Sequence, residues 1–204
     1  MKLLREFYIR DTLSVARDLI GKTLVTNKDG KICKGIIVET EAYLGKNDKA
    51  CHSYKNNSRP ADGLRSSRTN VMYGEGGYSY VYLIYGMHYC FNVVSSGENI
   101  PEAVLIRAVE PVEGIDVMME RRGFKTIYPL CSGPGKLCAA FAINKGDYGA
   151  DLCGDIIWIE DNGDSLERDI AATRRINVDY AGEDSLLPYR FIDKNSRFLS
   201  KFKV

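Results

Sequence analysis

The sequence contains no apolar stretch long enough to cross a membrane as a helix, which argues against an integral membrane protein. Its N-terminus, MKLLREFYIRD, carries charges where a signal peptide needs an apolar core. There are only two histidines and no HExxH motif, and the six cysteines form no CxxC pair and no zinc-type spacing. We therefore expect a cytoplasmic protein with free or buried thiols, no metal site and no membrane partner.

A strong excess of positive charge is also absent, because the formal net charge is only +1. Total charge therefore does not indicate a nucleic-acid-binding protein, although one cluster of basic residues does stand out. This Ser-, Asn- and Gly-containing segment, residues 54–68, predicts either a phosphate-contacting loop or an ordinary solvated loop. Its charged residues are Lys55, Arg59, Arg65 and Arg68 against Asp62.

The length of 204 residues and a hydrophobic content of 45% fit one domain spanning residues 1–204. Helices are expected at residues 11–21, at 113–122 and from Ser132 or Gly133 through 141. Residues 165–174 fit neither pattern clearly. Many strands with few helices between them predict an α+β fold with a curved, largely antiparallel sheet. Strands are expected at residues 23–26, 35–43, 102–111, 155–160 and 188–192, with a two-stranded hairpin at 78–94.

The most unusual segment is YSYVYLIYGMHYCFN at residues 78–92. In an extended conformation Tyr78, Tyr80 and Tyr82 share one face. The Tyr85–Gly86 pair suits a tight turn, so the segment predicts a β-hairpin with Tyr85 near its tip. Stacked tyrosines can hold a flat ring, and an aromatic residue at a tip can act as a wedge. An ordinary hydrophobic hairpin in a core is the alternative.

Two carboxylates occur on the otherwise apolar strand GIIVETEAY at residues 35–43. With a period of two, Ile37, Glu39, Glu41 and Tyr43 share one face. A buried carboxylate is costly unless it is paired, hydrogen-bonded or used in catalysis. The candidate partner is Arg107, which lies in the apolar run VLIRAVE. The pattern predicts either a catalytic carboxylate with its cation or a structural ion pair between strands.

A Gly- and Pro-rich segment, CSGPGKLC at residues 131–138, looks like a phosphate loop but lacks the Walker spacing. Pro134 in a first helical turn, followed by Lys136, predicts a helix start that could hold one phosphate. An ordinary helix cap explains the same residues.

Five blocks of sequence together resemble the alkyladenine (3-methyladenine) DNA glycosylase family of the mammalian type, in a compact bacterial form. The resemblance covers nearly the whole chain and implies a single glycosylase domain. It also implies a protruding β-hairpin, surrounding helices and a fold similar to the C-terminal domain of formyltransferases. The blocks are ETEAYLG with the following D, A and HS (39–53), YVYLIYGMHYCFN (80–92), VLIRAVEPVEG (104–114), CSGPGKLCAAFAI (131–143) and AGED with LPYRF (181–191).

The resemblance implies a monofunctional base excision repair enzyme that needs no cofactor. It would flip a damaged purine out of double-stranded DNA and hydrolyse the N-glycosidic bond with an activated water. The expected bases are 3-methyladenine and 7-methylguanine, with hypoxanthine and ethenoadenine left open. A monomer associated with the bacterial nucleoid is expected.

The resemblance also assigns the catalytic residues. Glu41 would be the general base, and Arg107 and the backbone carbonyl of Ile176 would hold the water. Glu39 is the competitor for the role of base, and only the resemblance favours Glu41. No lysine occupies a matched catalytic position, which argues against Schiff-base chemistry.

Binding residues follow from the same matched positions. Asn92 would exclude the 2-amino group of guanine, and Tyr85 would fill the gap left in the duplex. The expected substrate-binding residues are Tyr43, His52, Tyr82, Cys90, Asn92 and Leu105. The expected DNA-binding residues are Arg59, Tyr85, Met87 and Lys136.

The chain departs from the family pattern at His88, where an aromatic residue is usual, and in residues 54–70. A non-catalytic or RNA-directed base-binding module is one alternative function. Glu41 and Arg107 argue against it, because a stacking surface gains nothing from a carboxylate. A formyl-group transferase or hydrolase is a second alternative, resting on fold alone.

Overall fold

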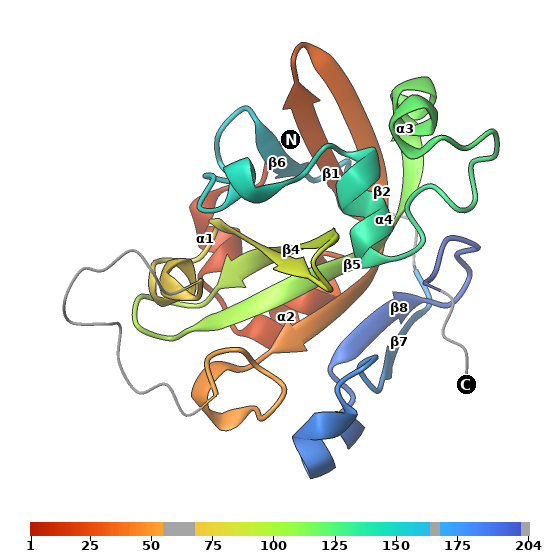
Figure 1. The fold of residues 1–204 in the computed structure, drawn as a ribbon. Coiled ribbons are helices and arrows are strands. Elements are labelled where there is room, and N and C mark those ends of the chain that lie inside the picture. The colour runs from red at the N-terminus through yellow and green to blue at the C-terminus, as the bar shows by residue number, and fades with distance from the viewer. Residues whose placement is uncertain (55–67, 164–167, 201–204) are drawn as a thin grey trace.

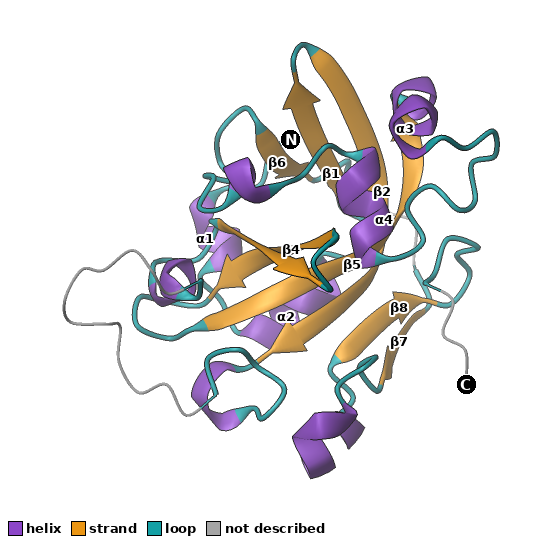
Figure 2. Ribbon diagram, viewed as in Figure 1, coloured by secondary structure: helices purple, strands orange, loops and turns teal. Residues whose placement is uncertain are grey.

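The computed structural model describes residues 1–54, 68–163 and 168–200. Its centre is a curved eight-stranded sheet with antiparallel pairing between neighbouring strands, as predicted (Figures 1 and 2). The strand order is β3-β4-β5-β2-β1-β6, and β8 pairs with both β2 and β7. The strands are β1 (Thr23–Lys28), β2 (Lys31–Tyr43), β3 (Ser79–Ile84), β4 (His88–Ser95), β5 (Glu102–Glu113), β6 (Ile157–Glu160), β7 (Ile170–Thr173) and β8 (Arg190–Asp193).

Short helices pack around this sheet. The predicted helix start at Asp11 is confirmed, because its carboxylate caps the helix by accepting a hydrogen bond from the Ser14 amide. None of the helices in the described ranges is long and apolar enough to cross a membrane. The α-helices are α1 (Arg5–Tyr8), α2 (Thr12–Asp18), α3 (Ile115–Arg122) and α4 (Pro134–Ala140). Single 3₁₀ segments occur at Gly45–Asn47, Asn70–Tyr73, Lys145–Asp147 and Asp179–Leu186.

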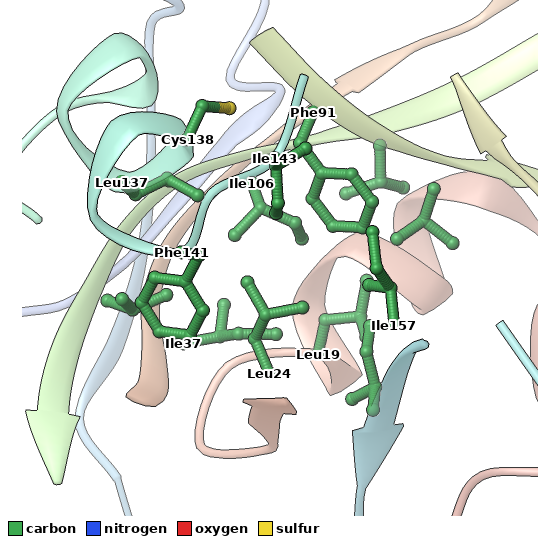
Figure 3. Close-up of a cluster of buried hydrophobic side chains, with 14 of the residues drawn as sticks. Leu19, Leu24, Ile37, Phe91, Ile106, Leu137, Cys138, Phe141, Ile143 and Ile157 are labelled. Atoms are coloured by element: carbon green, nitrogen blue, oxygen red, sulfur yellow. The ribbon is translucent and has the colours of Figure 1, made fainter. Parts of the chain in front are cut away.

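The main core lies between the sheet and helices α2 and α4. Figure 3 shows Leu137 of α4 close to Ile37 and Ile106 of the sheet, together with the residues that directly follow the two helices, Leu19 after α2 and Phe141 after α4. Gly35 is required on β2, since a Cβ there would lie 2.8 Å from a Val109 methyl and 3.0 Å from the Phe141 ring.

The central strand β2 does not alternate regularly, so one expectation is wrong. Ile37 pairs with Val109, and Glu39 rather than Val38 pairs with Ala108, which makes Val38 an extra residue in β2. A β-bulge of this kind reverses the alternation. Ile37 consequently packs in the main core, away from Glu39.

The opposite strand compensates at the next pair. Thr40 pairs with Ile106, so Arg107 is skipped in the register and is the extra residue of β5. Bulges redirect side chains and often occur next to active sites. Here the bulge places the Arg107 guanidinium against Glu39 and Glu41.

The predicted hairpin is formed by β3 and β4, with Ile84 opposite His88. Three residues, Tyr85–Met87, connect these partners, and the Met87 N–H closes a tight turn by donating to the Ile84 carbonyl at 3.3 Å. The central residues of this turn, Tyr85 and Gly86, have positive φ values of 54° and 67°. Tyr85 and Met87 are 74% and 71% exposed at the tip. The protruding hairpin is therefore confirmed, with its aromatic tip in solvent.

Candidate active site

A cavity of about 470 Å³ opens between the hairpin, the start of α4, the segment after β2 and the segment after β7. Its size suits a ligand as large as a purine. All six predicted substrate-binding residues line it, together with Arg107, Ile176 and Tyr85. These six residues come from segments far apart in the sequence and are Tyr43, His52, Tyr82, Cys90, Asn92 and Leu105.

Glu41 lies directly behind the cavity wall and is fully buried. One carboxylate oxygen accepts hydrogen bonds from the Tyr43 hydroxyl (2.8 Å) and Arg107 Nη1 (3.1 Å). The other accepts from the backbone N–H of Ile176 (2.7 Å). All three donors belong to cavity-lining residues, so Glu41 is a buried carboxylate oriented toward the cavity by the wall itself.

Glu39 has a different environment, although it shares Arg107. It is fully buried and accepts hydrogen bonds from Arg107 Nε (3.0 Å), Arg190 Nε (2.7 Å) and both the amide and hydroxyl of Ser200 (2.7 Å each). Neither carboxylate is among the residues that line the cavity, but three lining residues bind Glu41, whereas Arg107 is the lining residue that binds Glu39. The predicted ion pair between strands therefore exists, and Glu41 is its member next to the cavity.

Arg107 keeps its charge in this buried position. Burial by itself would lower the pKa of Arg107, but the charges of Glu41 and Glu39 raise it above the ordinary value. The guanidinium contacts the two carboxylates through different nitrogens, Nη1 and Nε. It can therefore fix Glu41 relative to Glu39 as a lysine could not.

An aromatic cluster forms the wall contributed by the hairpin. The rings of Tyr80 and Tyr82 lie 5.2 Å apart, and His52 contacts Tyr82 edge-on at 4.7 Å. His52 Nδ1 and the Tyr80 hydroxyl are hydrogen-bonded at 2.8 Å. Asn92 Nδ2 donates to the Tyr80 carbonyl at 2.9 Å, which fixes the orientation of its amide. The cavity thus offers ring faces beside one oriented amide.

His52 is expected to stay neutral well below neutral pH. Burial among these rings, together with the charge of Arg68, lowers the pKa of His52 to about 4. In the unfolded chain His52 takes up a proton near pH 6.5, whereas in the folded protein it does so only near pH 4. Acid therefore favours unfolding, and the stability linked to neutral His52 is lost as the pH falls from 6.5 to about 4. NMR titration of the imidazole signals, assigned with His52→Gln, should show a midpoint near 4. A midpoint at 6 or above contradicts this placement.

The predicted DNA-contact residues lie around the mouth of the cavity or outside the described ranges. Tyr85 lines the mouth, and Met87 lies beside it at the tip. Lys136 is exposed in the first turn of α4, next to the cavity-lining Pro134 and Gly135, and its ammonium lies 3.4 Å from the Ser132 hydroxyl. Arg59 falls among residues 55–67, which the structure does not describe.

Residues 6–197 match the model of the methylpurine-DNA glycosylase family. The chain belongs to this family. A protein of Alkaliphilus oremlandii is 48% identical over 98% of this chain and 100% of its own length. A protein of Methanocella arvoryzae is 49% identical over 97% of this chain and 94% of its own. Both are named "Putative 3-methyladenine DNA glycosylase".

Membership in the methylpurine-DNA glycosylase family makes this protein a DNA repair glycosylase, a hydrolase of N-glycosyl bonds in DNA. Within the described ranges, no group of three or more His, Cys, Asp or Glu side chains is placed to hold a metal ion. The six cysteines are free thiols, and Cys153 is the partly exposed one.

Sequence reasoning missed two residues next to this glycosylase cavity. Arg175 is buried behind it and binds Asp48 with both terminal nitrogens. Tyr180, on the rim, donates a hydrogen bond to the Ala50 carbonyl at 3.1 Å. The available sequence signals were Asp48, in the block at residues 39–53, and the pair Arg174–Arg175 before Ile176. Neither indicated a contact across more than a hundred residues.

Proposed function

We propose that this glycosylase removes alkylated purines from double-stranded DNA by binding the flipped base in the cavity and hydrolysing its N-glycosidic bond. The observation that carries this proposal is the buried Glu41, held by three wall residues directly behind an aromatic cavity. The name of the relatives, which specifies 3-methyladenine, supports the substrate class.

The cavity chemistry suits a cationic base. Alkylation at N3 or N7 gives the purine a positive charge, and such a ring is attracted to the faces of Tyr43 and Tyr82. A neutral His52 does not repel it. Asn92, its amide fixed by the Tyr80 carbonyl, would meet the base edge and exclude the 2-amino group of normal guanine. Cys90, opposite Tyr82 in the register, and Leu105, opposite Asn92, complete this pocket.

Glu41 would supply the chemical step. As the bond from C1′ to the purine nitrogen breaks, its electrons leave with the base and the sugar becomes oxocarbenium-like. A water held by Arg107 and the carbonyl of Ile176 attacks C1′ and gives its proton to Glu41. An alkylated purine is already a good leaving group, so no second carboxylic acid is required. Glu39, enclosed by Arg107, Arg190 and Ser200, would orient Arg107.

Tyr85 would hold the duplex open after flipping, with Met87 beside it and Lys136 and Arg59 on phosphates. Extruding a base costs a few kcal/mol of stacking and pairing, which an inserted ring partly restores. The exposed ring in the tight turn at the hairpin tip supports this role.

Tyr85→Asn, which tolerates the positive φ, is expected to slow base release from a lesion duplex about tenfold or more, since stacking contributes about 1–3 kcal/mol. Single-turnover release measures this. Tyr128→Asn is the control, at a half-exposed tyrosine that stacks on Phe198 and does not line the cavity, and it should keep the wild-type rate. Equal rates of base release for Tyr85→Asn and wild type would show that Tyr85 does not hold the duplex open.

A duplex carrying one 7-methylguanine tests the proposed function. The expected product is an abasic site that breaks only after alkali, as a monofunctional enzyme gives. Strand breakage without alkali would indicate lyase chemistry, and tight binding without base release would indicate a lesion-binding protein.

We further propose that residues 1–204 act as one domain and a monomer in the bacterial cytoplasm, at the nucleoid. Light scattering of the complex checks the stoichiometry.

A further inference from the structure

Arg175 is a buried cation that none of the proposed chemical steps uses. It is 5% exposed, and its two terminal nitrogens bind both carboxylate oxygens of Asp48. The same nitrogens donate to the carbonyls of Ala42 (3.0 Å) and Asp184 (3.1 Å). A paired, buried arginine that reaches four acceptor oxygens on three residues is fixed in place.

The guanidinium also lies over two aromatic rings. Its central carbon is 4.9 Å from the centre of the Tyr43 ring and 5.3 Å from that of Tyr189. Its buried Nε–H has no hydrogen-bond partner among the residues that the structure describes. The guanidinium of Arg175 therefore contacts the two rings although one of its buried N–H groups makes no hydrogen bond within the described residues. The arginine supports one face of Tyr43, a residue that lines the cavity.

Asp48 and Arg175 join the two segments that form this side of the cavity. Asp48 accepts hydrogen bonds from the Leu44 and Ala50 amides (3.0 Å each), which shapes the loop between Tyr43 and His52. The Lys49 amide donates to the Asp184 carboxylate at 2.8 Å, so the contact continues to the rim. Arg175 immediately precedes Ile176, whose amide holds Glu41.

We propose that Arg175 is a positioning residue for base binding, which with Asp48 fixes the Tyr43 ring so that its other face receives the flipped purine. This inference rests on the proposed role of Tyr43. An unpaired guanidinium on one face of the ring would oppose a cationic base on the other face. Asp48 cancels that charge.

Lysine cannot replace arginine in this role. An ammonium group is a compact charge that binds one carboxylate oxygen at a time and cannot lie flat against a ring. Arg175→Lys therefore keeps the charge and most of the length but removes the fork and the stacking surface. The matched control is Arg168→Lys, at a partly buried arginine that also pairs with an aspartate, Asp193 (2.7 Å), and does not line the cavity.

A double-mutant cycle tests the proposal. Single-turnover release of 7-methylguanine from a duplex is measured for wild type, Arg175→Lys, Tyr43→Leu and the double variant, with melting temperatures for each. Arg175→Lys should slow release about tenfold in the wild-type background and less than twofold in the Tyr43→Leu background. Arg168→Lys should release base at the wild-type rate.

Equal losses from Arg175→Lys in both backgrounds would overturn the inference, because the arginine would then act independently of Tyr43. An unaltered rate for Tyr43→Leu alone would overturn the proposed role of Tyr43 and this inference with it, so the two failures are distinguishable. Should Arg175→Lys not fold, Asp48→Asn takes its place in the cycle. This variant keeps one acceptor oxygen, removes the compensating charge and should give the same dependence on Tyr43.

Discussion

Replacing Glu41 with glutamine is expected to slow base release by about 10²–10⁴-fold, the usual contribution of a general base. Glutamine keeps the shape of the side chain, and its carbonyl oxygen can take the place of the Glu41 oxygen that accepts from Arg107 and from the Tyr43 hydroxyl. Its NH₂ group then faces the Ile176 N–H, so the hydrogen bond from that backbone amide is the one that is lost. The variant should therefore fold and bind lesion duplex, and lose the ability to take a proton from water. Single-turnover rates at saturating enzyme separate these effects.

Glu39→Gln is the matched control for this prediction. It changes the same chemical group two residues away, on a side chain that contacts Arg107, Arg190 and Ser200, of which Arg107 is the one that lines the cavity. We expect Glu39→Gln to reduce stability and to keep the rate of base release within about tenfold of wild type. A tenfold change in rate corresponds to about 1.4 kcal/mol in activation free energy. A larger rate loss for Glu39→Gln than for Glu41→Gln would exchange the assigned roles of the two residues.

Arg107→Met is expected to give the largest loss of stability. It removes the cation that the fully buried Glu39 and Glu41 share. Glu39 keeps its ion pair with Arg190, whereas Glu41 loses the one that the described residues provide. Removing one partner from a buried ion pair costs about 3–5 kcal/mol, because the remaining charge is uncompensated. Urea denaturation should therefore show a lower midpoint with an unchanged slope.

Arg107→Lys should lie between Arg107→Met and wild type, since an ammonium keeps the charge but cannot reach both carboxylates as Nε and Nη1 do. An Arg107→Met variant within 1 kcal/mol of wild type would show that the carboxylates do not depend on this cation. The proposed role of Arg107 in stabilising the buried Glu39 and Glu41 would then be wrong.

Much of the site could be predicted from local sequence pattern. The Tyr-rich run and the Tyr85–Gly86 turn predicted the hairpin, because alternation and positive φ are properties of a few consecutive residues. The strand positions of Glu41 and Arg107 followed in the same way, and their pairing was expected because buried charges require partners. The residue roles came from the family resemblance and are proposals that the experiments above test.

Other features depended on contacts that no local pattern encodes. The Val38 and Arg107 bulges arise from the register of two strands about 70 residues apart, and they overturned the predicted position of Ile37. Arg175 lies in a stretch without a clear period, and its contact with Asp48 spans 127 residues. Such pairs are determined by how the whole sheet packs.

The most direct test of the account is the release of free base from methylated duplex DNA, followed by chromatography, for wild type and Glu41→Gln side by side. The account predicts that the wild type releases methylated purines and leaves abasic sites, while Glu41→Gln binds the same DNA and releases almost none. Release by both proteins at similar rates would contradict the proposed role of Glu41. Release by neither would contradict the proposal that this cavity removes alkylated purines.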